Sequence, residues 1–253
     1  MSPFARTAIM EARAAQAVIE RYYRGNFEVK LKADQSPVTV ADVEAEEIIK
    51  GLITEAFPEH GFYGEETGRT RPDAEYVWLI DPIDGTKSFV RGVPFFSTQI
   101  ALMHQDRLLL GVSNAPVAGE LVWAERGAGA YLNDQPIRVS DISDIARSTL
   151  SFGNIKTLAA APQWTQLAEL IARVNRTRGY GDYLHYHMLA VGQLDIVIES
   201  DVNILDIAAL SIIVEEAGGR FTDLTGKPPG LATTTVLAAS TPALHEQVRV
   251  MLK

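Results

Sequence analysis

The sequence predicts a folded protein of the α/β class. Apolar residues recur at helical spacing in two stretches of the first 58 residues. Four short apolar runs separated by turns follow, and helix and strand signals then alternate along the rest of the chain. The 253 residues are enough to bury a sizeable core, and 47% apolar and 22% charged residues are ordinary proportions for a globular protein.

Two amphipathic helices are predicted at the start of the chain. Gly25 and Pro58 end them, because glycine and proline commonly terminate helices. The apolar face of the first contains Ala8, Ala12, Ala15, Ile19, Tyr22 and Tyr23, and that of the second contains Ala45, Ile48, Ile49, Leu52, Ile53 and Ala56.

A sheet is predicted to follow these helices, with turn-rich pieces such as Gly127–Gly129 between its strands. The stretch from Asn133 to Ser148 is polar, so we place a boundary there. An N-terminal α+β lobe would span residues 1–145 and a C-terminal α/β lobe residues 146–253. The predicted strands are Tyr76–Ile80, Thr98–Met103, Leu108–Val112 and Glu120–Ala124.

In the second lobe the clearest signal is a nearly all-apolar helix from about Ile204 to Ala217, stopped by Gly218 and Gly219. A helix that is apolar on all sides must be buried, so its single acid, Asp206, needs a partner. The elements predicted before it are a helix over Gln163–Val174, a strand at Arg176–Tyr180, a helix over Asp182–Val191 and a strand at Asp195–Glu199.

The charge balance and the lack of cysteine narrow the function. With 23 basic and 32 acidic residues the net charge is −9, which argues against a non-specific binder of nucleic acid or anionic membranes. Without cysteine there are no disulfides, thiolate zinc sites or cysteine nucleophiles, so a metal must sit on oxygen or imidazole. Early charges such as Arg6 and Glu11 interrupt any secretory signal, and no long apolar run is present, so we expect a cytoplasmic protein.

The segment Asp81-Pro82-Ile83-Asp84-Gly85-Thr86 follows the first predicted strand and suggests a cation site. Pro82 favours a tight turn, in which Asp81, Asp84 and the Ile83 carbonyl can point into one space as hard oxygen ligands. Gly85 permits close backbone approach, and a helix starting at Thr86 would direct free N–H groups at an anion. An Asp-rich turn with N-caps is the structural alternative.

Two further acidic segments accompany this one. Gly64-Glu65-Glu66-Thr67 lies upstream, and Asn203-Ile204-Leu205-Asp206-Ile207-Ala208-Ala209 lies downstream. In this order, and with the later Glu-Ala-Gly-Gly, the three segments resemble the signature of the inositol monophosphatase family of magnesium-dependent, lithium-sensitive phosphatases. The resemblance spans most of the chain and implies a layered α/β/α/β/α sandwich, commonly a homodimer, that acts on a small phosphomonoester.

Carried over by position, the resemblance assigns the site. Asp42 and Thr86 would position the attacking water, and Glu65 would be catalytic as well as a ligand. Asp84, Gly85, Thr86 and Asp206 would also contact the substrate. The implied metal ligands are Glu65, Asp81, the carbonyl of Ile83, Asp84 and Asp206.

Electrostatics supports a metal at these positions. Four converging carboxylates carry −4, and each like-charge pair near 4 Å costs about 4 kcal/mol at an effective dielectric of 20. Two or three divalent ions would remove this repulsion. Oxygen-only ligation favours Mg²⁺, or Mn²⁺ as a substitute, over zinc.

Other interpretations of the acids remain open. Asp42 could be the N-cap of the helix that ends at Ala56, Asp206 could complement a helix dipole, and Glu66 is expected outside the ligand shell. Asp81 as a covalent nucleophile of the haloacid-dehalogenase type is disfavoured, because two residues rather than one separate it from Asp84.

The histidines give a weaker signal. His185 and His187 are two apart on a predicted helix and therefore point to different faces. A zinc pair with Asp182 is accordingly disfavoured, and both are expected to be packing or surface residues.

Three segments favour the histidinol-phosphate phosphatase branch of the family: Thr86-Lys87-Ser88-Phe89, Arg178-Gly179-Tyr180-Gly181-Asp182 and Ala208-Ala209-Leu210. Histidinol offers an ammonium and an imidazole, whereas inositol offers only hydroxyls, so an added carboxylate suits histidinol. Asp182 and Glu199 are the expected recognition pair, with an N-cap and a surface strand-end acid as their structural alternatives. Two departures from the family pattern are Leu205 in place of the customary Trp and the atypical Ser200-Asp201-Val202-Asn203.

We therefore expect a magnesium-dependent phosphatase that converts histidinol phosphate and water into histidinol and phosphate, a step of histidine biosynthesis. The alternative within the family is an inositol-1-phosphatase or another small sugar or nucleotide phosphatase. A catalytically silent, metal-binding regulatory protein is the alternative from a different class.

Overall fold

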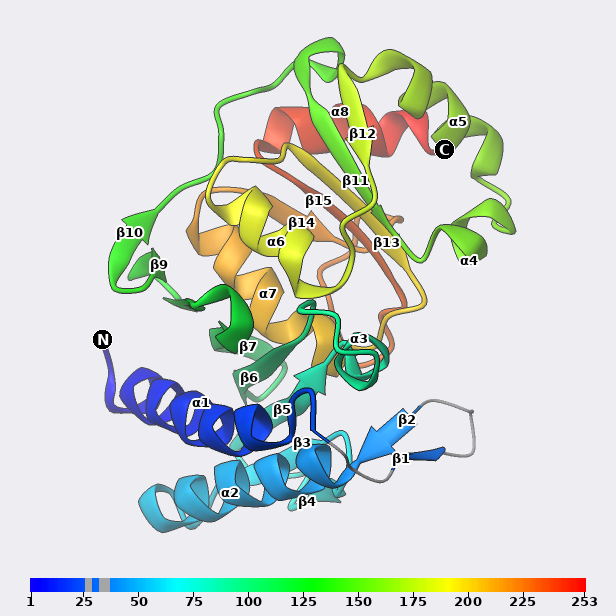
Figure 1. The fold of residues 1–253 in the computed structure, drawn as a ribbon. Helices are drawn as coiled ribbons and strands as arrows, with labels where there is room; N and C mark the ends of the chain where they lie inside the picture. The colour runs from blue at the N-terminus through cyan, green and yellow to red at the C-terminus, as the bar shows by residue number, and fades with distance from the viewer. Residues whose placement is uncertain (26–28, 32–36) are drawn as a thin grey trace.

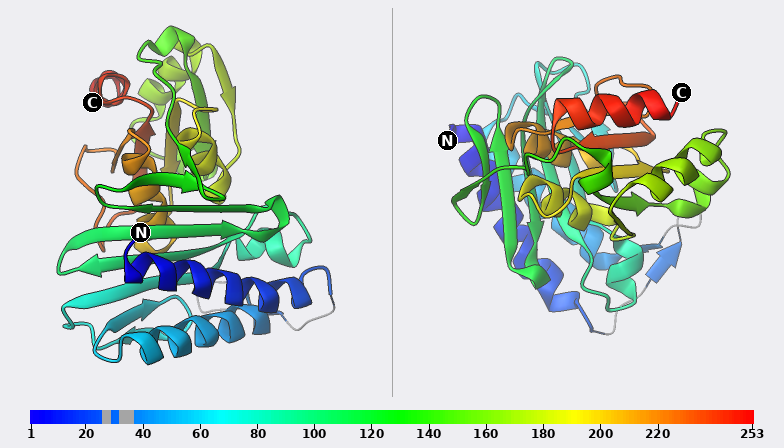
Figure 2. Two further views of the ribbon diagram at one scale, coloured as in Figure 1. Left: turned by 90° about the vertical axis from the view of Figure 1, so that its left-hand side faces the viewer. Right: turned by 90° about the horizontal axis from the view of Figure 1, so that it is seen from above.

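The computed structural model describes residues 1–25, 29–31 and 37–253, and these form five layers (Figures 1 and 2). Helices α1 (Pro3–Tyr22) and α2 (Val40–Ala56) cover one face of an eight-stranded sheet. Helices α6 (Asp182–Ala190) and α7 (Ile204–Glu216) lie between that sheet and a five-stranded sheet. Helices α4 (Ile155–Ala159), α5 (Trp164–Arg173) and α8 (Pro242–Met251) cover the outer face of the second sheet. The predicted α/β/α/β/α sandwich is confirmed.

A further helix, α3 (Thr86–Val90), has five residues. The strands are β1 (Val29–Leu31), β2 (Pro37–Thr39), β3 (Gly61–Gly64), β4 (Gly68–Thr70), β5 (Tyr76–Asp84), β6 (Ser97–His104), β7 (Arg107–Ala115), β8 (Glu120–Glu125), β9 (Gly129–Leu132), β10 (Gln135–Ile137), β11 (Thr149–Gly153), β12 (Arg176–Arg178), β13 (Ile196–Ser200), β14 (Arg220–Thr222) and β15 (Thr235–Ala239). In the part of the chain that is described, no helix is long and apolar enough to cross a membrane.

The two N-terminal helices form because each has an apolar face and a side-chain cap. Ser2 caps α1 by accepting a hydrogen bond from the Ala5 N–H at 3.1 Å, and Thr39 caps α2 by accepting one from the Ala41 N–H at 3.1 Å. Their apolar faces pack together and against β5, β6 and β7. Both predicted helices are confirmed.

The eight-stranded sheet has the order β10-β9-β8-β7-β6-β5-β3-β4. Strand β5 lies between β6 and β3 and extends beyond the predicted Ile80 to Asp84, because the chain stays paired with β6 across a bulge. Asp81 faces Gln99 and Asp84 faces Ser97, so two residues of β5 oppose one of β6 between them. The bulge places both aspartates of β5 at the same end of the strand.

Helix α7 is the buried centre of the molecule. Ten of its residues from Ile204 to Val214 are buried, and it packs against β5, β6, β7, β8 and β9 on one side and β14 on the other. Such a helix buries apolar surface on every face. The predicted all-apolar helix is confirmed, with its last residue at Glu216 rather than Ala217.

The five-stranded sheet has the order β12-β11-β13-β15-β14. The strand predicted at Arg176–Tyr180 is β12, which ends two residues earlier, and the strand predicted at Asp195–Glu199 is β13, which is shifted by one residue. The predicted helix over Gln163–Val174 is α5. The division into lobes at residues 145 and 146 stays a prediction. The elements that sequence analysis did not predict include β11, β14, β15, α4 and α8.

Candidate active site

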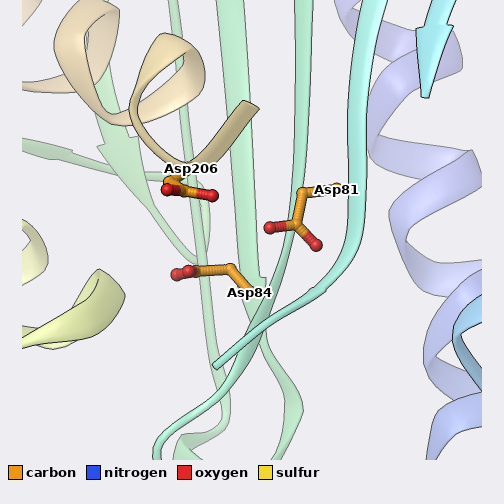
Figure 3. A group of neighbouring side chains, drawn as sticks. All are labelled: Asp81, Asp84 and Asp206. Carbon is orange, nitrogen blue, oxygen red and sulfur yellow. The ribbon is translucent and has the colours of Figure 1, made fainter. Parts of the chain in front are cut away.

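Three carboxylates from two distant parts of the chain meet beside the large sheet (Figure 3). Asp81 and Asp84 come from β5 on either side of its bulge, and Asp206 comes from the first turn of α7. One carboxylate oxygen from each lies within 4.8 Å of the other two. They line a cavity of about 200 Å³ together with Glu65, Ile83, Gly85, Thr86, Lys87, Ser88, Asn154, Asp182 and Asp201.

The electrostatics of this cluster is unfavourable for carboxylates alone. Burial, followed by the charges of Glu65, Asp84 and Asp206, raises the pKa of Asp81 well above its usual range. The pKa of Asp84 is also raised well above its usual range, by burial first. Burial raises the pKa of Asp206 to about 7, despite hydrogen bonds from Asn203. Ionised together, these groups require a counter-cation.

The donor set fits a hard divalent cation. Asp84 Oδ2 is fully buried and has no hydrogen-bond partner among the described residues. A buried carboxylate oxygen without a partner is costly unless a cation satisfies it. The groups around it are carboxylate and carbonyl oxygens, which suit Mg²⁺ or Mn²⁺ better than zinc.

Asp206 is held in place by the cap of its own helix. Its Oδ2 accepts a hydrogen bond from the Asn203 N–H at 2.8 Å, and its Oδ1 accepts one from Asn203 Nδ2 at 2.8 Å. This capping box fixes the carboxylate at the start of α7. The helix-terminus role predicted as an alternative for Asp206 is therefore present together with its place in the cluster.

Asp42 is not the N-cap of α2, contrary to the alternative considered from the sequence. Helix α2 begins at Val40, two residues earlier, because Thr39 supplies the cap. Asp42 is the third helical residue, and its Oδ2 accepts hydrogen bonds from the Thr39 N–H at 2.7 Å and Thr39 Oγ1 at 2.6 Å. Burial raises its pKa. The same capping box thus occurs at both acids, Asp42 and Asp206.

Thr86 lies between Asp42 and the β5 bulge. Its hydroxyl is 2.9 Å from the Ile83 carbonyl oxygen and 3.4 Å from Asp42 Oδ1, so both oxygens are within reach of its single hydrogen. Thr86 begins α3, as predicted. The residue before it, Gly85, has φ +89°, and a Cβ there would lie 2.5 Å from the Phe95 carbonyl oxygen. Only glycine fits this turn without displacing the backbone.

Glu65 follows β3 on a turn that joins α2 to the cluster. Its N–H donates to the Ile80 carbonyl at 3.0 Å, which anchors the turn to β5. The buried Glu46 of α2 accepts hydrogen bonds from the Glu66 N–H at 2.8 Å and the Thr67 N–H at 3.1 Å. Glu46 was not predicted from the sequence as a site residue. The pattern that could have identified it is its spacing of four residues from Asp42, which places both acids on one buried face of α2.

We expect Glu46→Gln to weaken metal binding without unfolding the protein. The amide NH₂ that replaces one oxygen faces N–H donors and cannot accept from them, so the turn carrying Glu65 loses part of its support. The metal concentration that half-saturates thermal stabilisation should rise roughly tenfold, as for other groups that orient ligands. The neighbouring exposed Glu47→Gln is the matched control. Equal metal responses in both variants would contradict the role of Glu46.

A larger cavity of about 590 Å³ adjoins the smaller cavity that contains the cluster. Asn154 and Asp182 line both cavities. Asp182 is the first residue of α6, and Gly181 is its N-cap, so the predicted N-cap alternative for Asp182 is wrong. Burial, followed by the charge of Glu199, raises the pKa of Asp182 to about 6. Glu199 also lines the larger cavity.

Glu199 is not a surface acid, contrary to the structural alternative from the sequence. It is 5% exposed, and its Oε2 accepts hydrogen bonds from Tyr186 Oη at 2.6 Å and from His185 Nε2 at 3.1 Å. Helix α6 packs over β13 and buries Glu199. The residue pattern within β13 alone does not show that a helix covers this part of the strand. The structure therefore brings Asp182 and Glu199 to one cavity.

The two histidines of α6 point to different faces, as predicted, and both are buried rather than on the surface. His185 contacts Glu199, whereas His187 contacts Glu120 through Nδ1 and Ser113 through Nε2, each at 2.8 Å. They therefore do not form a zinc pair with Asp182.

Comparison with known proteins identifies the family of this chain. The chain matches the model of the inositol monophosphatase family over residues 1–251. It is 36% identical to a histidinol-phosphatase of Chlorobaculum parvum, over 90% of this chain and 88% of that protein. It is 34% identical to an inositol-1-monophosphatase of Mesorhizobium japonicum, over 85% and 82%.

A solved structure has the same fold. The extragenic suppressor protein suhB of Bartonella henselae superposes with a TM-score of 0.91 at 31% identity, covering 100% of this chain and 99% of that one. The match of the family model over nearly the whole length, together with these relatives, decides the assignment. The chain belongs to the inositol monophosphatase family and is a phosphatase of that family.

Proposed function

We propose that this protein is a magnesium-dependent phosphomonoesterase that hydrolyses histidinol phosphate. The observation that carries the proposal is the placement of Asp182 and Glu199 in a cavity that adjoins the Asp81, Asp84 and Asp206 cluster. The smaller cavity is lined by oxygens that can bind a metal, and the larger cavity is lined by acids that can bind a cationic group. The similarity to a histidinol-phosphatase supports the same substrate.

The metal would be held by Glu65, Asp81, Asp84, Asp206 and the carbonyl of Ile83, with two or three Mg²⁺ ions and Mn²⁺ as a substitute. When bound, Mg²⁺ supplies Lewis acidity that polarises the phosphoryl oxygens and stabilises the leaving alkoxide. Support comes from Asp84 Oδ2, which is buried and has no hydrogen-bond partner in the described ranges, and from the raised pKa of Asp206. Li⁺ is expected to inhibit.

Thr86 and Asp42 would orient the attacking water and move its proton. With its hydroxyl hydrogen directed at Asp42 Oδ1, 3.4 Å away, Thr86 presents lone pairs that can accept a hydrogen from the water. Burial raises the pKa of Asp42, which strengthens it as a base. Gly85 and Thr86 at the start of α3 would face the phosphate. The water would attack phosphorus in line, and a covalent phosphate trapped on Asp81 would contradict this mechanism.

Asp182 and Glu199 would bind the cationic histidinol moiety. An ammonium and a protonated imidazole form charge-assisted hydrogen bonds with carboxylates, whereas the hydroxyls of inositol form only ordinary ones. The alternative substrate is inositol 1-phosphate, favoured by the similarity to an inositol-1-monophosphatase. We also propose a homodimer located in the cytoplasm, and sedimentation of the purified protein would test its dimeric state.

We expect histidinol phosphate to be the best substrate in a panel with inositol 1-phosphate, fructose 1,6-bisphosphate and 3′-phosphoadenosine 5′-phosphate. Asp182→Asn should lower kcat/KM for histidinol phosphate roughly 30-fold or more, because a desolvated charge pair contributes about 2 to 5 kcal/mol when truncated. Hydrolysis of inositol 1-phosphate should change far less, since it lacks a cation.

The exposed Asp141→Asn is the control for this substitution. Phosphate release at fixed Mg²⁺ is the measurement. A wild-type preference for inositol 1-phosphate, or an equal loss on both substrates in Asp182→Asn, would refute the histidinol assignment and leave the broader family activity in place.

A further inference from the structure

The carboxylate of Glu199 is held by two donors on the same oxygen. Tyr186 Oη donates to Oε2 at 2.6 Å, and His185 Nε2 lies 3.1 Å from the same atom. Burial and the charge of Glu199 raise the pKa of Tyr186 well above its usual range, so its hydroxyl keeps the proton. All three side chains are buried. A carboxylate oxygen only accepts, so the proton of the second contact belongs on His185 Nε2.

The other ring nitrogen of His185 continues the chain of contacts. His185 Nδ1 is 3.3 Å from Ser151 Oγ, and Ser151 Oγ accepts a hydrogen bond from the Tyr180 N–H at 3.2 Å. Since that oxygen already accepts from Tyr180, its own hydrogen is free to donate to Nδ1. The hydrogen-bond directions are therefore consistent along the chain of contacts: Tyr180 donates to Ser151, Ser151 donates to His185, and His185 donates to Glu199.

The second oxygen of Glu199 is confined by Gly153. A Cβ on Gly153 would lie 1.9 Å from Glu199 Oε1, so this oxygen occupies the space that a side chain at position 153 would need. Gly153 and Glu199 both line the larger cavity, as does Tyr180. Both described hydrogen bonds of Glu199 use Oε2. Oε1 is therefore the oxygen that the carboxylate offers to a ligand.

We infer that His185, held on its other ring nitrogen by Ser151, is a positioning residue that orients Glu199 to receive the cationic end of the substrate. The inference rests on the proposed function for the nature of the substrate. It adds a residue that does not line the larger cavity itself but fixes the orientation of one that does. His185 also joins three elements, since Ser151 lies on β11, Glu199 on β13 and His185 on α6.

The protonation of His185 is the first test and needs no substrate. In the wild-type protein labelled with ¹⁵N-histidine, NMR correlations from the ring protons to the ring nitrogens should place a proton on His185 Nε2. The signal is assigned by its loss in His185→Gln. A ring in which Nε2 carries no proton would overturn the inference, because it could not donate to Glu199.

The second test separates positioning from a structural role. His185→Leu removes the donor, and we expect the KM for histidinol phosphate to rise at least about tenfold with a much smaller change in kcat, as for loss of a hydrogen bond to a charged group. His185→Gln carries an amide nitrogen that can donate to Oε2, so it should recover most of the lost affinity. His245→Leu is the matched control, since His245 is also buried and contacts Thr222 at 2.8 Å.

The outcomes are distinguishable. Equal KM increases for histidinol phosphate and inositol 1-phosphate, or no recovery in His185→Gln, would overturn the inference. If His185→Leu fails to fold, Ser151→Ala replaces it, with a smaller KM increase expected for histidinol phosphate alone. A wild type that prefers inositol 1-phosphate would refute the substrate proposal, whereas the NMR result would still decide whether His185 donates to Glu199.

Discussion

Asp84→Asn should lower turnover by on the order of 10²-fold or more, because the electrostatic stabilisation that a metal provides is usually worth several kcal/mol. The substitution is nearly isosteric, so the fold should survive. The carboxylate it removes follows the bulge of β5, with Oδ2 buried and unpartnered within the described part of the chain. Metal-induced thermal stabilisation should be reduced together with turnover.

The same variant should be more stable than the wild type once metal is stripped. Burial and the charges of Asp182, Asp206 and Glu199 raise the pKa of Asp84, so its ionised form is unfavourable in the folded protein. A carboxyl with a raised folded-state pKa binds protons more readily when folded, and the stripped wild type therefore gains stability as the pH falls. The advantage of Asp84→Asn should be greatest at pH 8 and shrink toward pH 5.

Thermal melts with and without Mg²⁺ measure both effects. The exposed Asp106→Asn serves as control, since it removes one charge away from the cluster. If Asp84→Asn keeps the full metal-induced stabilisation, Asp84 is not a ligand.

Thr86→Val should lower kcat about 10²-fold or more on histidinol phosphate and inositol 1-phosphate alike, because positioned proton transfer contributes about 10² to 10⁴. The two substrates share the attacking water, so the loss does not depend on the alcohol. Valine keeps the shape of threonine but lacks the hydroxyl that lies 3.4 Å from Asp42 Oδ1. Metal-induced stabilisation should remain, in contrast to Asp84→Asn.

Thr86→Ser retains a hydroxyl and should keep most of the activity. Single-turnover phosphate release separates the chemical step from product release in all three proteins. A loss confined to one substrate, or an equally inactive Thr86→Ser, would show that the hydroxyl does not act on the water.

The parts of the fold and site that could be predicted from the sequence are those with a local signal. The helix at Ile204–Glu216 is apolar at nearly every position, and the segment from Asp81 to Thr86 combines turn residues with acids directly after an apolar strand. Both patterns need only neighbouring residues. The resemblance to a family added the distant partners, Asp42, Glu65 and Asp206.

The parts that could not be predicted depend on packing between distant elements. The burial of Glu199 follows from α6 lying over β13, and its partners His185 and Tyr186 belong to a different element. The strand at Thr149–Gly153 is short and pairs in parallel with β12 and β13, so no hairpin turn marks it. Glu46 acts on a turn twenty residues away.

The most direct test of the metal-dependent phosphatase is phosphate release from histidinol phosphate by protein stripped of metal. We expect no activity in excess chelator, recovery when Mg²⁺ is returned, and inhibition by millimolar Li⁺. Asp206→Asn, treated in the same way, should not recover, because its carboxylate belongs to the cluster within 4.8 Å of Asp81 and Asp84. Full activity of the wild type in excess chelator would contradict the account.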